Sequence, residues 1–187
     1  MEAQKSNKIS DLAESNLRSQ EKIKEEFYLL ILSLSDSSNK DQKKHLHSSI
    51  LRENKTRYIK LNLIFDNPFN THMLSTYEYP KIGYITLKER FQLKNDDYQE
   101  LMGHSWASVQ KRAKDDLISE KHSEKLVHNI HVLYKGLEIF GDEDAMNRWL
   151  RKFNPFLGAK PIDLLKTVTG IDMVLEEMDR LFEGSLA

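Results

Sequence analysis

The sequence predicts a mainly α-helical protein of 187 residues. Beyond Thr86, apolar residues recur at spacings of three and four, which is the period of one face of a helix. All seven glycines lie at or after Gly83, where they punctuate short helices, whereas the first 82 residues contain none. Only residues 58–65 alternate apolar and polar side chains with the period of two that is typical of a strand.

The N-terminal extension, residues 1–84, has one candidate helix, the candidate short strand and a basic segment. The helix is predicted by apolar residues at 4-3-4 spacing, namely Ile23, Phe27, Leu30 and Leu34. It either packs on the rest of the chain or forms a dimerising seam with a second copy. Residues 40–60 hold seven basic and two acidic side chains, a pattern typical of a solvated face or of a phosphate-binding surface. Asn67-Pro68 is expected to end the strand.

Two short helices joined by a turn are predicted after a first helix that carries Leu87, Phe91 and Leu93. Asn95 is the expected N-cap of the first of the two, and Gly103 stands where a C′ glycine belongs. Ser105 is the expected N-cap of the second, whose apolar side carries Trp106, Val109 and Ala113. Helix, glycine turn and helix together indicate a helix-turn-helix motif.

In that motif the N-terminal part of the second helix enters the DNA major groove. The candidate DNA-binding residues are therefore Ser105, Ser108, Gln110, Lys111 and Arg112. Gln110 has the amide that reads adenine edges, and the two cations suit guanine or phosphate. Residues 85–127 contain eight basic and eight acidic side chains, however, so a strong attraction to DNA is not evident from charge.

Helices also fill the C-terminal part. After Ser119 a long helix is predicted by apolar residues at 4-3-4-3 spacing, namely Leu126, Ile130, Leu133, Leu137 and Phe140. Gly141 ends it, and Asp142 caps the next helix. Pro161 is placed to start a further helix after a loop at residues 154–159. Thr169 and Asp172 have capping-box spacing and are expected to open the last helix, which Gly184 closes.

Composition and motifs argue against an enzyme. The chain has no cysteine, which excludes disulfides, thiol nucleophiles and cysteine-bound metal. No dinucleotide-binding, P-loop or nucleophile-elbow motif occurs, and no cofactor is expected. His128 and His131 could share a metal, but no third ligand is evident, and we favour two histidines on the polar side of the long helix. A net charge of −1 and short apolar runs favour a cytoplasmic protein that is not a DNA coat.

Residues 137–184 resemble a known family, the C-terminal toxin-binding domain of the Xre/MbcA/ParS antitoxins. The matching positions are Phe140, Gly141, Asp142, Ala145, Trp149, Leu150, Asn154, Pro155, Leu157, Gly158, Pro161, Asp163, Leu164, Leu165, Thr167, Gly170, Val174 and Gly184. Upstream, the framework of the family's Xre-like helix-turn-helix module is matched by Leu101, Gly103, Ser105, Val109 and Arg112. The chain departs from the pattern at Phe153, where proline is frequent, and at Ala159, where a second glycine is common.

The resemblance implies an antitoxin of a type II toxin–antitoxin system. Such proteins bind a RES-domain toxin that consumes NAD and block its active site, and many form homodimers that repress their own operon through DNA binding. The alternative is a stand-alone DNA-binding transcription regulator that retains the fold without a toxin. We therefore divide the chain into the extension at 1–84, an Xre-like helix-turn-helix module at 85–136 and a small helical toxin-binding domain at 137–187.

Most matched residues are expected to be core or cap residues, so toxin contacts are sought at exposed positions. The candidate toxin-binding residues are Arg148, Arg151, Lys160, Arg180, Glu183, Gly184, Ser185, Leu186 and Ala187. In the family, the C-terminal end reaches into the toxin's cleft. Residues 138–187 hold six basic and ten acidic side chains, and this acidic balance suits a partner cleft that is basic because it binds a dinucleotide.

Overall fold

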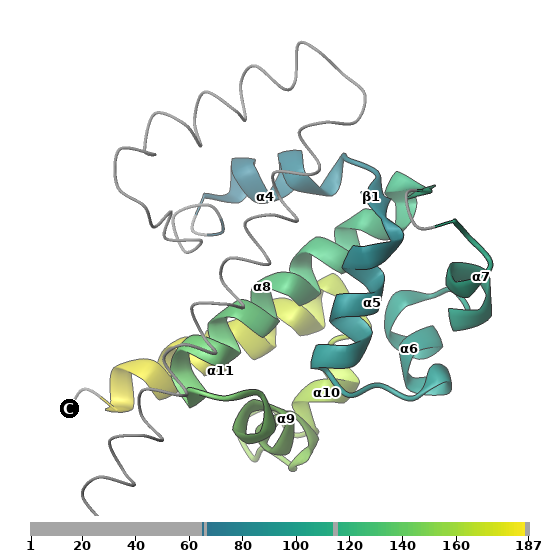
Figure 1. Cartoon of the computed structure of the whole chain (residues 1–187). Helices are drawn as coiled ribbons and strands as arrows, with labels where there is room; N and C mark the ends of the chain where they lie inside the picture. The colour runs from purple at the N-terminus through teal and green to yellow at the C-terminus, as the bar shows by residue number, and fades with distance from the viewer. Residues whose placement is uncertain (1–64, 66, 114–115, 186–187) are drawn as a thin grey trace, which may run out of the picture.

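The computed structural model describes residues 65, 67–113 and 116–185, and this part is mostly helical, as the sequence predicts (Figure 1). Its elements are α4 (Pro68–Ser75), β1 (Tyr79–Pro80), α5 (Lys81–Arg90), α6 (Asn95–Met102), α7 (Trp106–Gln110), β2 (Leu117–Ile118), the 3-10 helix η1 (Glu120–His122), α8 (Ser123–Phe140), α9 (Glu143–Arg151), α10 (Pro161–Leu164) and α11 (Val168–Ser185).

The predicted N-terminal helix and the basic segment lie outside the described residues. So do residues 58–64 of the candidate strand. Phe65, the last residue of that segment, is helical and buried rather than part of a strand. Asn67 does not simply end a strand: its side chain accepts a hydrogen bond from the Phe69 N–H (3.0 Å), and Pro68 opens α4. Proline is common at the first position of a helix, because its missing N–H costs no hydrogen bond there. The sequence analysis did not predict α4.

The long helix α8 is the centre of the fold. Figure 1 shows it crossing the molecule with α11 alongside, while α4, α5 and α9 pack on its other sides. Leu126 and Leu133 are completely buried, in agreement with the predicted apolar face. The helix ends as predicted at Gly141, whose φ of 80° is a left-handed conformation that glycine adopts without strain.

A small antiparallel sheet joins the start of α5 to the segment after α7. Tyr79 pairs with Ile118, and Pro80 pairs with Leu117. The sequence predicted neither strand, because two residues are too few to show an alternating pattern. Figure 1 shows α5, α6 and α7 on one side of α8, next to this sheet.

The two short helices α6 and α7 are joined by the predicted turn. Gly103 has a φ of 76°, and the Ser105 hydroxyl accepts a hydrogen bond from the Ser108 N–H (3.3 Å), so both predicted caps are confirmed. Asn95 is the first helical residue of α6 rather than its N-cap, since the cap position is occupied by Lys94. The second helix is shorter than predicted: α7 ends at Gln110, and Ala113 lies beyond it.

The last helix begins earlier than predicted. The Gly170 N–H donates to Thr167 Oγ1 (3.1 Å), so Thr167 supports the start of α11 and Thr169 lies within its first turn. The capping box predicted from Thr169 is therefore wrong. Gly184 does not close the helix either, because α11 continues to Ser185.

Two helices run across the boundaries between the three parts that we assigned from the sequence. The boundary at residue 84 falls within α5, and the boundary at residue 136 falls within α8. None of the helices in the described part of the chain combines the length and apolarity needed to cross a membrane.

Candidate partner-binding surface

The loop at residues 152–160, between α9 and α10, is held in one conformation by Asn154. The backbone N–H of Asn154 donates to the Ala159 carbonyl (2.9 Å), which closes the loop. Its side-chain Oδ1 accepts from the Phe156 N–H (2.8 Å) and the Leu157 N–H (3.3 Å). An asparagine can satisfy backbone donors in this way because its short amide imitates a turn.

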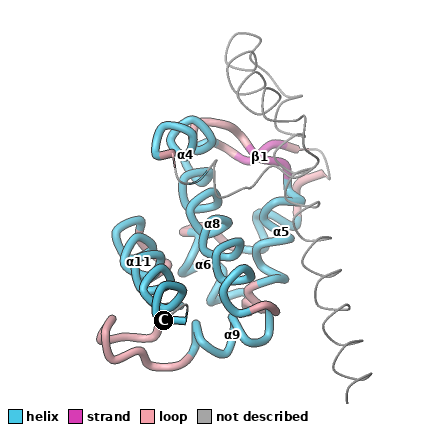
Figure 2. The backbone as a smooth tube through the Cα atoms, turned by 90° about the vertical axis from the view of Figure 1, so that its left-hand side faces the viewer, coloured by secondary structure: helices cyan, strands magenta, loops and turns pink. Residues whose placement is uncertain are grey.

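The same asparagine connects the loop to α11. Its Nδ2 donates to Glu177 Oε1 (3.0 Å). Glu177 is only 6% exposed, and its carboxylate also accepts from Nε and Nη2 of Arg180, both at 2.7 Å. These hydrogen bonds from Arg180 are the main reason why the pKa of Glu177 is lowered. Figure 2 shows the loop lying beside the C-terminal half of α11.

Arg180 also lies against an exposed aromatic ring. Its guanidinium carbon Cζ is 3.9 Å from the centre of the Phe156 ring. Phe156 is 74% exposed, and Phe153 on the same loop is 58% exposed. Two phenylalanines in this position keep apolar area in water, which a folded chain normally avoids where it can.

We call these residues the loop surface: Lys152, Phe153, Phe156, Lys160 and Arg180. The charge of this surface is positive, although residues 138–187 together carry an excess of acidic side chains. Several of those acidic groups are occupied elsewhere in the fold. Glu143 pairs with Arg90, Asp144 accepts from Gln92 (2.9 Å), and Asp179 pairs with Lys135. The acidic balance expected from the sequence therefore does not describe the loop surface.

A second group of contacts attaches α9 to the turn that follows α5. Asn147, 2% exposed, donates from Nδ2 to the Arg90 carbonyl (2.7 Å) and the Glu143 carbonyl (2.9 Å). Arg151 donates from Nη1 to Asn147 Oδ1 (2.7 Å) and from Nη2 to the Phe91 carbonyl (2.5 Å). The guanidinium of Arg151, a candidate toxin contact, is thus used to hold the helices together.

Replacing Asn147 with alanine is expected to lower the free energy of unfolding by about 2 kcal/mol, because the Arg90 carbonyl and the Arg151 guanidinium lose a partner in a partly buried place. Urea unfolding followed by circular dichroism measures this effect. Arg148→Ala, at an exposed position of the same helix, is the control and should change stability by less than about 0.5 kcal/mol. Equal effects of the two substitutions would contradict the prediction.

The structure places the other candidate toxin contacts in different surroundings. Arg148 lines an open cavity of about 390 Å³ between α9 and the turn at Gln92. Lys160 is exposed and directly precedes α10. Glu183 and Gly184 are exposed in the last turns of α11, and Ser185 is its final residue. Leu186 and Ala187 lie outside the described residues.

The candidate DNA contacts lie along α7, from its N-cap Ser105 to Arg112 just beyond its end, and several of their groups already have partners. Ser105 and Ser108 bond to each other, since the Ser108 hydroxyl donates to the Ser105 carbonyl (2.6 Å). Arg112 donates from Nη1 to the Leu117 carbonyl (3.0 Å). Gln110 and Lys111 are exposed. Lys81 donates to the Gln110 carbonyl (2.8 Å) and the Arg112 carbonyl (2.9 Å). Its ammonium group therefore places a positive charge at the C-terminal end of α7, where the helix dipole favours a cation.

The histidine pair on α8 is not arranged as the sequence suggested. His131 stacks on Phe65, with ring centroids 4.4 Å apart, so it does not lie on a polar side of the helix. Burial lowers its pKa to about 4. Within the described residues there is no group of three or more histidine, aspartate or glutamate side chains that could hold a metal ion.

Sequence reasoning missed the two phenylalanines and the role of Glu177. Phe153 and Phe156 stand on either side of Asn154-Pro155, in a segment without helical periodicity. Apolar residues in such a loop are a signal that could have identified them as exposed. The pairing of Glu177 with Arg180 has helical i, i+3 spacing and can be read from the sequence. The hydrogen bond from Asn154 to the buried Glu177 carboxylate depends on the fold.

These features define a helical binding module, with a loop and a helix end that display aromatic and basic side chains. Residues 135–184 match the family model described as the antitoxin Xre/MbcA/ParS C-terminal toxin-binding domain. This match confirms the resemblance of residues 137–184 to the family's toxin-binding domain. The match includes α9, the loop surface and almost all of α11. A comparison with curated proteins gives no match.

Proposed function

We propose that this chain is the antitoxin of a type II toxin–antitoxin system, and that it neutralises a RES-domain, NAD-consuming toxin by covering the toxin's active site. The observation that carries the proposal is the match of residues 135–184 to a toxin-binding domain. The structure supports a binding role, because the caps and the core of this segment hold an exposed loop and an exposed helix end in fixed positions.

Co-expression tests the proposed function. The chain is expressed together with the RES-domain protein encoded beside its gene, and growth and the cellular NAD level are followed. The full chain should restore both to the level of cells without toxin. Absence of rescue, with both proteins present at normal levels, would contradict the proposal.

A shortened chain separates two ways of blocking the active site. Removal of residues 183–187 takes away the end of α11 without touching Arg180 or Glu177. Loss of rescue would support a block by the C-terminal end. Continued rescue would assign the block to the body of the domain.

Operator binding is a second candidate function, favoured by the α6–turn–α7 arrangement with Gln110 and Lys111 exposed at its end. We propose that a homodimer uses this helix-turn-helix to repress its own operon. The test is a mobility shift with the DNA upstream of the gene. The double substitution Gln110→Ala, Lys111→Ala should weaken binding, whereas Lys94→Gln should not. Binding to that DNA by a chain that does not neutralise any RES protein would favour the stand-alone regulator instead.

A further inference from the structure

We propose that the loop surface anchors the partner by placing Arg180 against a carboxylate on an acidic face of the toxin, with Phe153 and Phe156 packing around this contact. The inference rests on the proposed function and names the part of the domain that makes the contact. It commits to an acidic protein surface as the occupant.

Arg180 is prepared for such a contact before the partner arrives. Nε and Nη2 donate to the Glu177 carboxylate, both at 2.7 Å, and the guanidinium carbon Cζ lies over the Phe156 ring. Glu177 is in turn fixed by Asn154. Because Arg180 has few conformations left to lose, binding costs it less side-chain entropy than it would cost a free arginine.

The arginine still has donors to offer. In the part of the chain that the structure describes, no hydrogen bond from Nη1 of Arg180 is found, and its side chain is 48% exposed. A guanidinium has five N–H donors in a planar fork, and a carboxylate matches two of them at once. The free edge of Arg180 therefore suits a carboxylate of the partner.

The aromatic side chains support a protein partner. Phe153 and Phe156 expose their rings beside the same loop, and burial of such rings is a large favourable term in protein association. Binding energy at interfaces is concentrated in a few aromatic and arginine residues that become fully desolvated. A ring that supports an arginine from one side combines both kinds of contact.

Charge favours an acidic partner surface. Between Ala145 and Ile162 the chain has four basic residues and no acidic residue. The fold adds Arg180 to this segment, and the nearest acidic group, Glu177, is buried in its pairing with Arg180. Binding of a nucleic acid needs a longer series of basic side chains on the protein, which follows the phosphate backbone, than this short loop provides.

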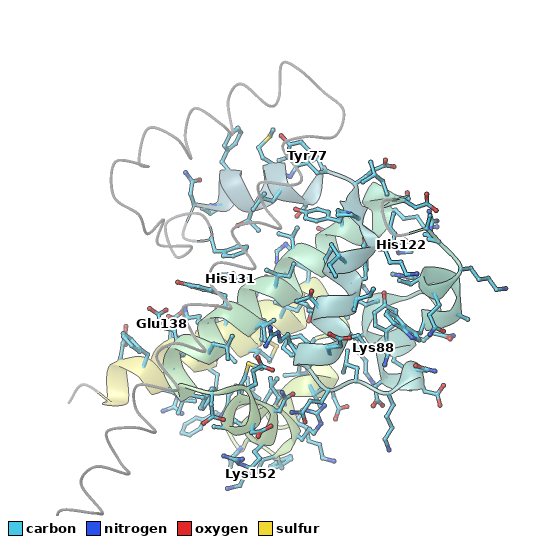
Figure 3. All side chains as sticks on the ribbon, viewed as in Figure 1. Tyr77, Lys88, His122, His131, Glu138 and Lys152 are labelled. Atoms are coloured by element: carbon cyan, nitrogen blue, oxygen red, sulfur yellow. The ribbon has the colours of Figure 1, made fainter. Side chains whose placement is uncertain are left out.

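The position of the loop surface is compatible with the proposed block of an active site. Arg180 precedes Ser185, the end of α11, by five residues, or about 8 Å of helix. A partner seated on Phe156 and Arg180 is therefore within reach of the C-terminal end. Lys152, on the loop surface, lies at the opposite side of α8 from Tyr77, which follows α4 (Figure 3).

Binding of the full chain to the RES-domain protein encoded beside it, measured by isothermal titration calorimetry, tests the inference. Phe156→Ala and Arg180→Gln should each raise the Kd roughly 10- to 100-fold. Phe69→Ala removes another strongly exposed phenylalanine, 65% exposed on α4, and is the control for Phe156. Lys94→Gln is the control for the loss of a cation. Both controls should leave the Kd within about twofold of the wild-type value.

Circular dichroism and thermal unfolding show which variants are folded. Arg180→Gln removes a partner of a buried carboxylate, so Phe156→Ala, at an exposed site without that difficulty, decides the matter if Arg180→Gln unfolds. If the wild-type chain binds and Phe156→Ala does not change the Kd, the inference is overturned and the proposed function stands. If the wild-type chain does not bind the RES-domain protein, both the inference and the proposed function are contradicted.

A parallel titration with a single-stranded oligonucleotide addresses the other macromolecule that a basic and aromatic surface could hold. The inference expects no binding that depends on Phe156. Oligonucleotide binding that Phe156→Ala abolishes, with toxin binding unchanged, would overturn it. A larger loss of toxin affinity on raising the salt concentration for wild type than for Arg180→Gln would support it, because salt screens the contact that the variant lacks.

Discussion

At pH 5 the free energy of unfolding is expected to be about 3 kcal/mol lower than at pH 7.5, because two histidines are held neutral in the folded protein. The pKa of His104 is lowered to about 4 from an ordinary value of 6.5, mainly by burial and then by the nearby His122. Burial is also the first cause of the lowering of the His131 pKa to about 4.

The contacts of His104 explain why it resists protonation. Its Nδ1 faces the Met102 carbonyl (3.3 Å), which can only accept, so Nε2 accepts from the Tyr98 hydroxyl (2.9 Å). A second proton would have to displace that hydroxyl hydrogen. It would also place a positive charge next to His122, whose ring centre is 4.1 Å away.

The sign follows from the two pKa values. Below pH 6.5 the unfolded chain binds protons at these histidines, whereas the folded protein does not until the pH is near 4. Stability is therefore unaffected by these histidines above about pH 7 and falls as the pH decreases from 6.5 to 4. Each histidine would contribute about 2 kcal/mol at pH 5, and solvent screening reduces the sum.

Urea unfolding between pH 7.5 and pH 5 measures this loss. The double variant His104→Gln, His131→Gln should be less stable at pH 7.5 but should lose clearly less stability on acidification. His72→Gln, at an exposed position of α4, should behave like the wild-type protein. The same loss in the double variant as in wild type would contradict the assignment to these two histidines.

Gly170→Ala is expected to lower the free energy of unfolding by about 3 kcal/mol. Gly170 is buried in the first turn of α11, where that helix approaches the end of α10. A Cβ atom at this position would lie 2.1 Å from the Leu164 carbonyl oxygen and 2.9 Å from Thr167 Oγ1. Backbone cannot rotate out of the way as a flexible side chain can, so α10 and α11 would have to separate.

Gly184 provides the matched control within the same helix. An added Cβ there would meet no atom within 4 Å. Gly184→Ala is therefore expected to stabilise the protein by up to about 1 kcal/mol, because alanine has the higher helix propensity. Thermal unfolding of both variants makes the comparison, and a Gly170→Ala variant as stable as wild type would show that the close approach is not maintained in solution.

Features that depend on neighbouring residues could be predicted from the sequence. Gly103, Ser105, Gly141 and Asp142 act as the predicted caps, and Asp142 Oδ1 accepts the Ala145 N–H at 2.7 Å. Each of these contacts joins groups at most four residues apart. The pattern of residues therefore contains the information that places them.

The prediction failed where a more distant part of the chain decides the outcome. The sequence analysis names Arg151 among the exposed toxin contacts, but its guanidinium reaches the Phe91 carbonyl of a turn sixty residues earlier in the chain. No local spacing signals this contact.

The sequence by itself determined the helical class, the main caps and the toxin-binding family of residues 135–184, since all three depend on local patterns and ordered motifs. Only the tertiary structure decided that the loop at residues 152–160 meets Glu177 and Arg180 of α11. Only the structure, too, showed that Arg151 binds the turn after α5. These contacts join parts of the chain that become neighbours when α9, α10 and α11 bury their apolar faces against α8 and one another.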